Sequence, residues 1–277
     1  MNSQPKTQAV KQWLQAAVKE LSEAGIPTSR LDAEIILAHT LRKPRTYLHA
    51  HSEALIDARN LEIADARLQL RLDRTPIAYI VGHKEFYGRQ FKVTPVTLIP
   101  RPESEVMIDS LKHHLHVPTG NKLVDVGTGS GCLGITAKLE LPQLDVTLTD
   151  ISRHALYIAE TNAKQLKASV TIIHGNLLDN FPFTTDIILA NLPYVDQEWE
   201  RSPETEHEPA EALFASDSGL HLISRLIIQT KSQLAPKGLL LLEADPRQHT
   251  AIVKAATALN LTLLKNEGFI LTFQKTI

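Results

Sequence analysis

The chain has 277 residues, of which 43% are hydrophobic and 22% charged, with 29 basic and 31 acidic side chains. This length predicts one large domain and a smaller one, and the balanced charge argues against a protein that binds nucleic acid mainly by neutralising phosphates. The single cysteine, Cys132, excludes an intramolecular disulfide. No apolar run approaches the roughly 20 residues that a membrane span needs. We therefore expect a cytoplasmic protein without a membrane segment and without direct nucleic-acid binding.

Residues 1–75 are predicted to form a helical domain. Apolar residues recur at helical spacing from Val10 to Leu21, and Gly25 provides a stop signal. Ser29 is expected to cap a second helix, and a third helix begins near Asp57. The segment has 11 basic and 9 acidic residues, a small excess that favours a domain docking a protein partner.

Residues 76–102 are predicted to connect this domain to the next. A turn at Gly88 between aromatic-rich flanks predicts a short hairpin, and Pro100 and Pro102 predict a rigid exit. A helix is expected to begin near Glu103.

Residues 103–277 alternate between β-like runs and helical patterns. Alternation of this kind predicts an α/β domain with a doubly wound parallel sheet. The strands are expected at 122–126, 145–149, 169–173, 185–190 and 238–243, with a hairpin over 261–275.

A glycine-rich loop follows the first of these strands, in the run Asp125-Val126-Gly127-Thr128-Gly129-Ser130-Gly131. Glycines allow the backbone to turn tightly where a side chain would collide with a ligand. The helix from Cys132 directs its N-terminal amides at the same place. Asp150 ends the next strand, at the spacing of a carboxylate that receives ribose hydroxyls.

Three interpretations of this loop are open: binding of S-adenosylmethionine, binding of a dinucleotide, and a structural turn without a ligand. A carboxylate at Asp125 suits the ammonium of a methionine moiety and would repel a pyrophosphate, which favours S-adenosylmethionine. Gly129, Gly131 and Gly134 also satisfy the G-x-G-x-x-G pattern of dinucleotide-binding proteins, and a purely structural turn remains the third interpretation.

A second motif, Asn191-Leu192-Pro193-Tyr194, follows the apolar run 187–190. The Asn191 side-chain oxygen and the Leu192 carbonyl can accept both N–H bonds of a planar NH2 group, while Pro193 fixes the turn and Tyr194 can stack on the group. Methyl transfer to such a nitrogen depends mostly on positioning. By itself the tetrapeptide could equally be a polar turn after a strand.

Together with these motifs, three further segments make the chain resemble the release-factor glutamine methyltransferases, whose usual acceptor motif is Asn-Pro-Pro-Tyr. The segments are Arg74-Thr75-Pro76-Ile77-Ala78-Tyr79-Ile80 with Glu85-Phe86-Tyr87-Gly88, Thr97-Leu98-Ile99-Pro100-Arg101-Pro102-Glu103-Ser104-Glu105, and Glu208-Pro209 with Ala212-Leu213 and Gly219-Leu220. The resemblance covers essentially the whole chain.

The resemblance implies a seven-stranded Rossmann-like methyltransferase domain after a small helical bundle. It implies S-adenosyl-L-methionine as the methyl donor, no metal, and the Gly-Gly-Gln glutamine of peptide chain release factors as the acceptor. The donor would be bound by Asp125, Gly127, Thr128, Gly129, Ser130, Gly131 and Asn191, its ribose by Asp150 and its adenine beside Leu177. Asn191, Leu192, Pro193 and Tyr194 would hold the glutamine and carry the catalysis.

The chain departs from the family pattern at two positions. Leu192 replaces the first proline of the acceptor motif, which keeps the carbonyl and loosens the turn. Asn176 stands where an acidic residue is common, beside the expected adenine position.

Four other functions stay open at this point. A ribosomal-protein glutamine methyltransferase tends to carry Pro-Arg-Ser-Pro, where this chain has Pro100-Arg101-Pro102-Glu103. An adenine amino methyltransferase would need a basic target-recognition region. A non-catalytic donor-binding adaptor and a dinucleotide-dependent oxidoreductase are the remaining alternatives.

Several charged or reactive side chains have no settled role in the sequence. Arg101, Glu103 and Glu105 fit either a solvated cluster or a wall of the acceptor cleft, and Glu208 is equally open. Cys132 is interpreted as packing. The close spacing of His113, His114 and His116 predicts a surface face rather than a metal site.

Overall fold

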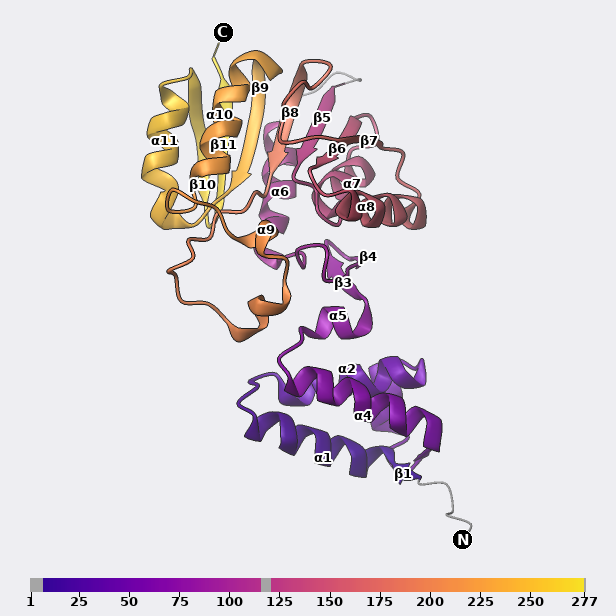
Figure 1. Ribbon diagram of the computed structural model, residues 1–277. Coiled ribbons are helices and arrows are strands. Elements are labelled where there is room, and N and C mark those ends of the chain that lie inside the picture. The colour runs from indigo at the N-terminus through magenta and orange to yellow at the C-terminus, as the bar shows by residue number, and fades with distance from the viewer. Residues whose placement is uncertain (1–6, 116–120, 277) are drawn as a thin grey trace. The chain divides into compact units, whose positions relative to one another are not determined.

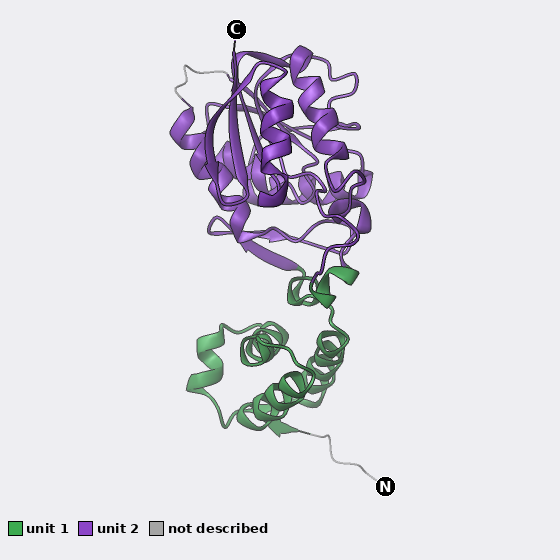
Figure 2. Cartoon of the chain, turned by 90° about the vertical axis from the view of Figure 1, so that its left-hand side faces the viewer, with its two compact units in different colours: residues 1–82, 202–207 green, residues 83–201, 208–277 purple. Residues whose placement is uncertain are grey.

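The computed structural model describes residues 7–115 and 121–276, which divide into two compact units (Figure 2). The first unit is the chain up to Gly82 together with Ser202–His207, and the second is His83–Arg201 together with the chain from Glu208 onward. The first unit extends past residue 75 because the short helix α5 (Ile77–Val81) contacts α2 and α4.

The first unit is helical, and its core is built from the apolar faces of amphipathic helices. Trp13, Ile36 and Leu61 are among the buried residues that α1, α2 and α4 contribute. The two-residue strands β1 and β2 pair antiparallel, so the segment before α1 lies beside the segment before α4. The elements are β1 (Gln8–Ala9), α1 (Val10–Glu23), α2 (Ser29–Leu41), α3 (Arg45–Ala50), β2 (Leu55–Ile56), α4 (Ala58–Leu72), α5 and the 3-10 helix η2 (Pro203–His207).

The predicted helix starts are confirmed at one position and wrong at another. Asp57 caps α4 by accepting a hydrogen bond from the Asn60 amide at 3.0 Å. Ser29 is not a cap but the first residue of α2, because Thr28 precedes the helix and its hydroxyl donates to Asp32 at 2.8 Å. The six-residue α3 and five-residue α5 are too short to give a periodic signal.

The segment 202–207 packs within the first unit, although the sequence predicts it as part of the second. Arg71 is 5% exposed and donates from Nε to Asp32 at 2.7 Å and from Nη2 to Glu204 at 3.1 Å. His207 Nε2 lies 2.8 Å from the Asp73 carbonyl. These contacts depend on a buried arginine that local patterns do not reveal.

The second unit contains a seven-stranded sheet in the order β10-β11-β9-β8-β5-β6-β7 (Figure 1). Its strands are β5 (Lys122–Val126), β6 (Asp145–Asp150), β7 (Thr171–His174), β8 (Thr185–Ala190), β9 (Leu234–Glu243), β10 (Leu261–Glu267) and β11 (Ile270–Lys275). The predicted strands and the terminal hairpin are confirmed. The expectation of a parallel sheet holds for β9 to β7 only, because β11 is antiparallel to both of its neighbours.

Helices cover both faces of this sheet, and the predicted hairpin at Gly88 precedes it. The remaining elements are β3 (His83–Phe86), β4 (Arg89–Lys92), η1 (Pro102–Ser104), α6 (Glu105–His114), α7 (Cys132–Glu140), α8 (Arg153–Leu166), α9 (Ala210–Leu213), α10 (His221–Gln233), η3 (Pro246–Gln248) and α11 (His249–Thr257). Within the described residues, none of these helices or those of the first unit is long and apolar enough to cross a membrane.

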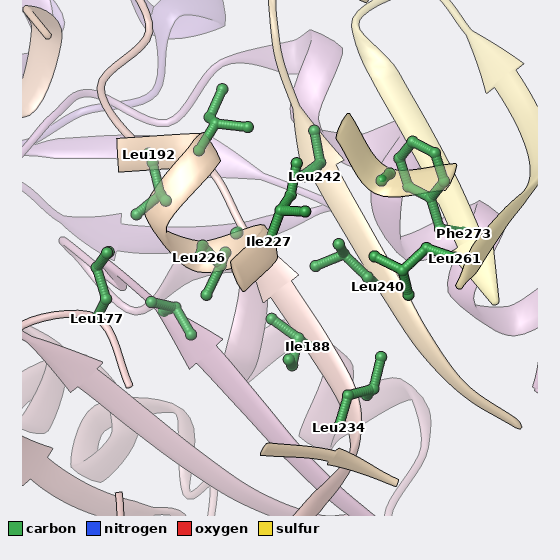
Figure 3. Packing of buried hydrophobic residues seen from close by; sticks show 14 of the residues in the cluster. Leu177, Ile188, Leu192, Leu226, Ile227, Leu234, Leu240, Leu242, Leu261 and Phe273 are labelled. Atoms are coloured by element: carbon green, nitrogen blue, oxygen red, sulfur yellow. The ribbon is translucent and has the colours of Figure 1, made fainter. Parts of the chain in front are cut away.

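Successive residues of the central strands alternate between two buried faces. Ile188 and Leu240 pack with Leu226 and Ile227 of α10 in one cluster, which Leu177 and Leu192 extend toward the carboxyl end of the sheet (Figure 3). Ile187 belongs to the cluster on the other face, against α6, α7 and α8. Burial on both faces explains the continuous apolar runs from which these strands were predicted.

Candidate active site

A cavity of about 290 Å³ lies in the second unit at the carboxyl ends of the parallel strands. This edge of a doubly wound sheet is the general place for ligands in such folds. The predicted site residues that line the cavity are Gly127, Thr128, Gly129, Ser130, Asp150, Leu177, Asn191, Leu192 and Pro193. The other three predicted residues, Asp125, Gly131 and Tyr194, do not line the cavity.

The glycine loop lies between the end of β5 and the start of α7. Gly127, Gly129 and Gly131 have φ values of +70°, +56° and +82°, a region that side chains other than glycine rarely adopt. A Cβ on Gly129 would meet no atom within 4 Å, whereas one on Gly127 would lie 2.8 Å from Leu192 and one on Gly131 would lie 2.6 Å from Ile135. The loop is therefore open at Gly129 and closely packed on either side of it.

The next strand holds the loop in place through its last residue. Asp150 Oδ2 accepts a hydrogen bond from the Gly129 amide at 2.9 Å, and Oδ1 accepts from the Ser152 amide at 2.8 Å. Burial raises the pKa of Asp150, and these backbone hydrogen bonds oppose that rise. Each oxygen retains a lone pair for a hydroxyl in the cavity.

Asp125 is buried beneath the loop. Its Oδ2 accepts hydrogen bonds from the Thr128 hydroxyl at 2.6 Å and from the Gly134 amide at 2.9 Å. Its Oδ1 is buried and has no hydrogen-bond partner among the described residues. Burial raises the pKa of Asp125 to about 6, against the opposing effect of the two hydrogen bonds.

The acceptor tetrapeptide begins directly after β8 and packs against the glycine loop. Leu192 is 3% exposed, and a Cβ added to Gly127 would lie 2.8 Å from its Cδ2. Asn191 also lines the cavity. The two motifs that the sequence predicts independently thus share one cavity and contact each other.

Three residues from other elements hold the tetrapeptide. Asn191 Nδ2 donates to Ser104 Oγ at 3.1 Å, and Ser104 Oγ donates to Glu243 Oε2 at 2.5 Å. The Tyr194 hydroxyl donates to Glu243 Oε1 at 3.1 Å, and Gln248 Nε2 donates to the Tyr194 carbonyl at 2.8 Å. Tyr194 is therefore tied down at both its hydroxyl and its carbonyl.

Burial dominates the electrostatics of this group. It raises the pKa of Glu243, with hydrogen bonds from Ser104, Tyr194 and Asn191 opposing the rise. Burial and the neighbouring Glu243 carboxylate both raise the pKa of the Tyr194 hydroxyl, which stays protonated.

The role of the charged connector residues follows from their partners. Arg101 donates to Glu208 at 2.5 Å, and the other Glu208 oxygen accepts from the Ile99 amide at 3.2 Å. These hydrogen bonds join the segment at Glu208, which follows the acceptor tetrapeptide in the chain, to the connector beside the cavity. Glu105 accepts from the Tyr87 amide at 2.8 Å and so supports the hairpin turn, whereas Glu103 is exposed.

The cysteine and the histidines of the 113–116 cluster are placed as follows. Burial raises the pKa of the Cys132 thiol to about 12, although the residue lines the cavity. His114 Nδ1 lies 2.9 Å from the Ser110 carbonyl, and His116 lies outside the described residues. No group of metal-ligating side chains occurs in residues 7–115 and 121–276.

Sequence reasoning missed Ser104, Glu243 and Gln248 as parts of the site. Ser104 lies in the segment Thr97–Glu105, from which no role for it follows, and Glu243 ends a predicted strand. An acidic residue at the carboxyl end of a buried strand was the available signal, the same one that identified Asp150.

Comparison with known proteins gives two family matches. The PrmC N-terminal domain profile matches residues 12–82, and the methyltransferase small domain profile matches residues 102–270. Together they cover both units.

Proteins with similar sequences carry two kinds of methyltransferase name. A release factor glutamine methyltransferase of Koribacter versatilis is 37% identical over 86% of this chain and 88% of its own length. One from Coxiella burnetii is 36% identical over 87% and 85%. A bifunctional methyltransferase of Rickettsia felis is 34% identical over 89% of this chain but only 53% of its own length.

Solved structures agree with the fold. A methyltransferase from Pyrococcus furiosus superposes with a TM-score of 0.54 at 19% identity, covering 77% of this chain and 98% of that one. A Thermus thermophilus 16S rRNA N2 G1207 methyltransferase gives 0.51 at 15% identity, covering 70% and 50%. At these identities the likeness concerns the methyltransferase fold alone.

Proposed function

The chain belongs to the release factor glutamine methyltransferase family, and on that premise we propose that it methylates the glutamine of the Gly-Gly-Gln motif in peptide chain release factors. The methyl group of S-adenosyl-L-methionine passes to the side-chain amide nitrogen. A C–N bond forms as the C–S bond breaks, the sulfonium becomes a neutral thioether, and the nitrogen loses one proton to solvent.

One observation carries this proposal: the glycine loop and the acceptor tetrapeptide line the same cavity. A donor on Gly127–Ser130 and an amide at Asn191 would therefore be neighbours. Holding both reactants in one water-poor cavity supplies the positioning on which a sulfonium methyl transfer depends.

The donor fits the residues around the loop. Asp125 retains one buried carboxylate oxygen without a partner among the described residues, which suits a nearby cation such as the donor's ammonium. The open backbone above Gly129 leaves room for the donor chain, and the free lone pairs of Asp150 suit ribose hydroxyls. Leu177, 8% exposed and in the left-handed region at φ +53°, offers an apolar side chain for the adenine.

The acceptor amide would be held at the tetrapeptide. Asn191 Oδ1 and the Leu192 carbonyl can each accept one N–H of the glutamine amide, which fixes the nitrogen and favours the positive charge that develops on it. The buried hydroxyl of Tyr194 is already bonded to Glu243, so its contribution to acceptor binding is made through the aromatic ring or through support of the turn.

Docking of the release factor is assigned in this proposal to the helical unit. A groove of about 750 Å³ on α1, α2 and α3 has an apolar part formed by Leu14, Val18 and Leu48. Charged residues of both signs surround it, namely Lys11, Lys19, Glu23, Arg30 and Glu34. The single cysteine and the near-neutral charge support our predictions of a cytoplasmic location and of no direct nucleic-acid binding.

The test is methyl transfer in a purified system. The chain, S-adenosylmethionine and a release factor are incubated, and peptide mass spectrometry is expected to find one added methyl group on the Gly-Gly-Gln glutamine. A release factor with alanine in place of that glutamine is the matched negative substrate.

N191A tests the assignment of the acceptor site. It should bind the donor within about twofold of the wild type, and kcat should fall at least about a hundredfold because one oriented acceptor is lost. A release factor left unmodified by the wild-type chain would refute the proposal. An added methyl group on a ribosomal protein or on adenine instead would point to the rival acceptors.

A further inference from the structure

The Asn191 carboxamide has two ends of similar shape and opposite polarity. Its oxygen accepts hydrogen bonds, and its NH2 group only donates them. If the proposed function is right, the substrate amide brings N–H donors, so only the oxygen end can hold it. Some feature of the protein must therefore fix which end faces the cavity.

The contacts of Asn191 select one orientation. Nδ2 donates to Ser104 Oγ at 3.1 Å, whereas Oδ1 accepts no hydrogen bond among the described residues. The orientation depends on Ser104 and Glu243. A hydroxyl can either donate its single proton to Oδ1 or accept from Nδ2, and a hydrogen bond from the Asn191 side chain also lowers the pKa of the Glu243 carboxyl.

The direction of the Ser104 hydroxyl is in turn set by Glu243. Ser104 Oγ donates to Glu243 Oε2 at 2.5 Å. Burial raises the pKa of Glu243, but the hydrogen bonds that its two oxygens receive favour the ionised form, which accepts hydrogen bonds without donating any. The serine proton is thereby used, and its lone pairs face Asn191. Ser104 is 1% exposed and Glu243 2% exposed, so bulk water does not offer either group another partner.

The other Glu243 oxygen reinforces the same polarity. Oε1 accepts from the Tyr194 hydroxyl at 3.1 Å. One buried carboxylate therefore accepts a hydrogen bond from Tyr194 and orients Asn191 through Ser104 and by a direct interaction, so that it acts at both ends of the acceptor tetrapeptide.

We propose that Glu243, acting through Ser104, is a positioning residue that turns Oδ1 of Asn191 toward the acceptor cavity. The three side chains come from the end of β9, the end of η1 and the residue after β8. This inference rests on the proposed methyl transfer to an amide, and it explains how a chemically symmetric-looking side chain acquires a defined polarity.

The hydrogen bonds that link Asn191, Ser104 and Glu243 form a relay with one direction of donation. Two substitutions, N191D and E243Q, can reverse that direction without changing the net charge. In N191D, Ser104 faces a carboxylate on each side and has one proton for both. In the double variant N191D/E243Q, the glutamine introduced at position 243 can donate from Nε2 to Ser104. The serine hydroxyl then donates to one oxygen of the aspartate introduced at position 191, and the second oxygen of that aspartate faces the cavity as an acceptor.

The expected result is therefore rescue. N191D and E243Q should each lower kcat on the release factor by about tenfold or more, and the double variant should be at least about tenfold faster than N191D, a strong coupling between contacting sites. Placing S104A in the double variant should remove most of the rescue, because the serine hydroxyl no longer links positions 191 and 243.

Two results would overturn the inference: a double variant no faster than the product of the single effects predicts, or an E243Q enzyme with kcat within about twofold of the wild type. E140Q is the matched control, because Glu140 binds Arg89 and Lys112 outside the cavity. Its kcat should not change by more than about twofold. Thermal melts confirm that each variant is folded.

The wild-type reaction separates this inference from the function beneath it. A wild-type chain that methylates no glutamine refutes the proposed function itself. Methylation by the wild type without rescue in the N191D/E243Q double variant refutes only the role of Glu243.

Discussion

At the scale of single residues, Leu192 differs most from the family's usual acceptor motif, and it is also buried. Its side chain is 3% exposed, belongs to the cluster that includes Leu226, and contacts the position of Gly127. Its side chain thus holds the tetrapeptide against the glycine loop, and in the proposed function its carbonyl accepts a hydrogen bond from the acceptor amide.

This packing predicts the effect of restoring proline. L192P removes part of a buried side chain and should lower the free energy of unfolding by about 1–3 kcal/mol. Turnover should fall rather than rise, because the gain in turn rigidity comes with a loosened contact to Gly127. Urea denaturation and kcat measure the two effects.

L192M is the control for this substitution, since a volume-conserving exchange of apolar residues costs less than about 1.5 kcal/mol. A proline variant that is both faster and more stable than the wild type would show that leucine is a poor fit at this position.

At the scale of elements, the segment that contains Glu204 and Glu208 makes hydrogen bonds in both units. Glu208 binds Arg101 and the Ile99 amide within the second unit, whereas Glu204, four positions earlier, binds Arg71 within the first. A single loop that follows the acceptor motif is therefore anchored by buried or half-buried charges in each unit.

The Glu204 anchor predicts a dependence of stability on pH. Burial alone would raise the pKa of Glu204, but hydrogen bonds from Ser202, from its own backbone amide and from Arg71 lower it from 4.5 to about 2. A carboxyl with a lowered folded-state pKa stabilises the protein above its unfolded-state value, and this contribution is lost as the pH falls from about 4.5 towards 2. E204Q should therefore be less stable than the wild type at pH 7, with a difference that shrinks below about pH 4.5.

The measurement is urea unfolding of the helical unit from pH 7 to pH 3, followed by the fluorescence of buried Trp13 in a W199F background. E267Q removes an exposed carboxylate from the β10–β11 hairpin and should change stability by less than about 0.5 kcal/mol at pH 7. A wild-type to E204Q difference that stays constant from pH 7 to pH 3 would contradict the assignment.

At the scale of the whole molecule, the proposal assigns chemistry and partner docking to different units. All residues that line the catalytic cavity belong to the second unit, and all that line the groove on α1, α2 and α3 belong to the first. Substitutions in the groove should then affect the recognition of a large substrate without affecting the transfer step.

V18D tests this division, because it places a charge on the apolar part of the groove. KM for the intact release factor should rise about tenfold or more, since buried contacts at the centre of an interface carry most of its affinity. The kcat on a short Gly-Gly-Gln peptide and the donor affinity should stay within about twofold. A16D, on α1 but outside this groove, is the control, and thermal melts check that both variants fold.

An equal rise in KM for the peptide and the intact factor would place the effect of V18D on the catalytic unit. That outcome would remove the docking role from the helical unit while leaving the methyl transfer intact.

Local signals in the sequence were sufficient for most of the fold and for both halves of the site. Apolar runs marked β5 and β8 at their observed bounds, glycines marked the donor loop, and Asn191 to Tyr194 marked the acceptor loop. Each of these depends on the residue's own conformation or on neighbours in the chain, and the order of elements in a doubly wound sheet brings the strand ends together.

Tertiary structure alone decided what supports these loops. Ser104 lies 139 positions from Glu243 and 87 from Asn191, and Arg71 lies 133 positions from Glu204. No periodicity or turn preference encodes such pairs, because a buried polar group acquires its role from the partner that satisfies it after folding. The sequence by itself determined which residues can meet a donor and an acceptor, and the packed structure determined which side chains hold them in place.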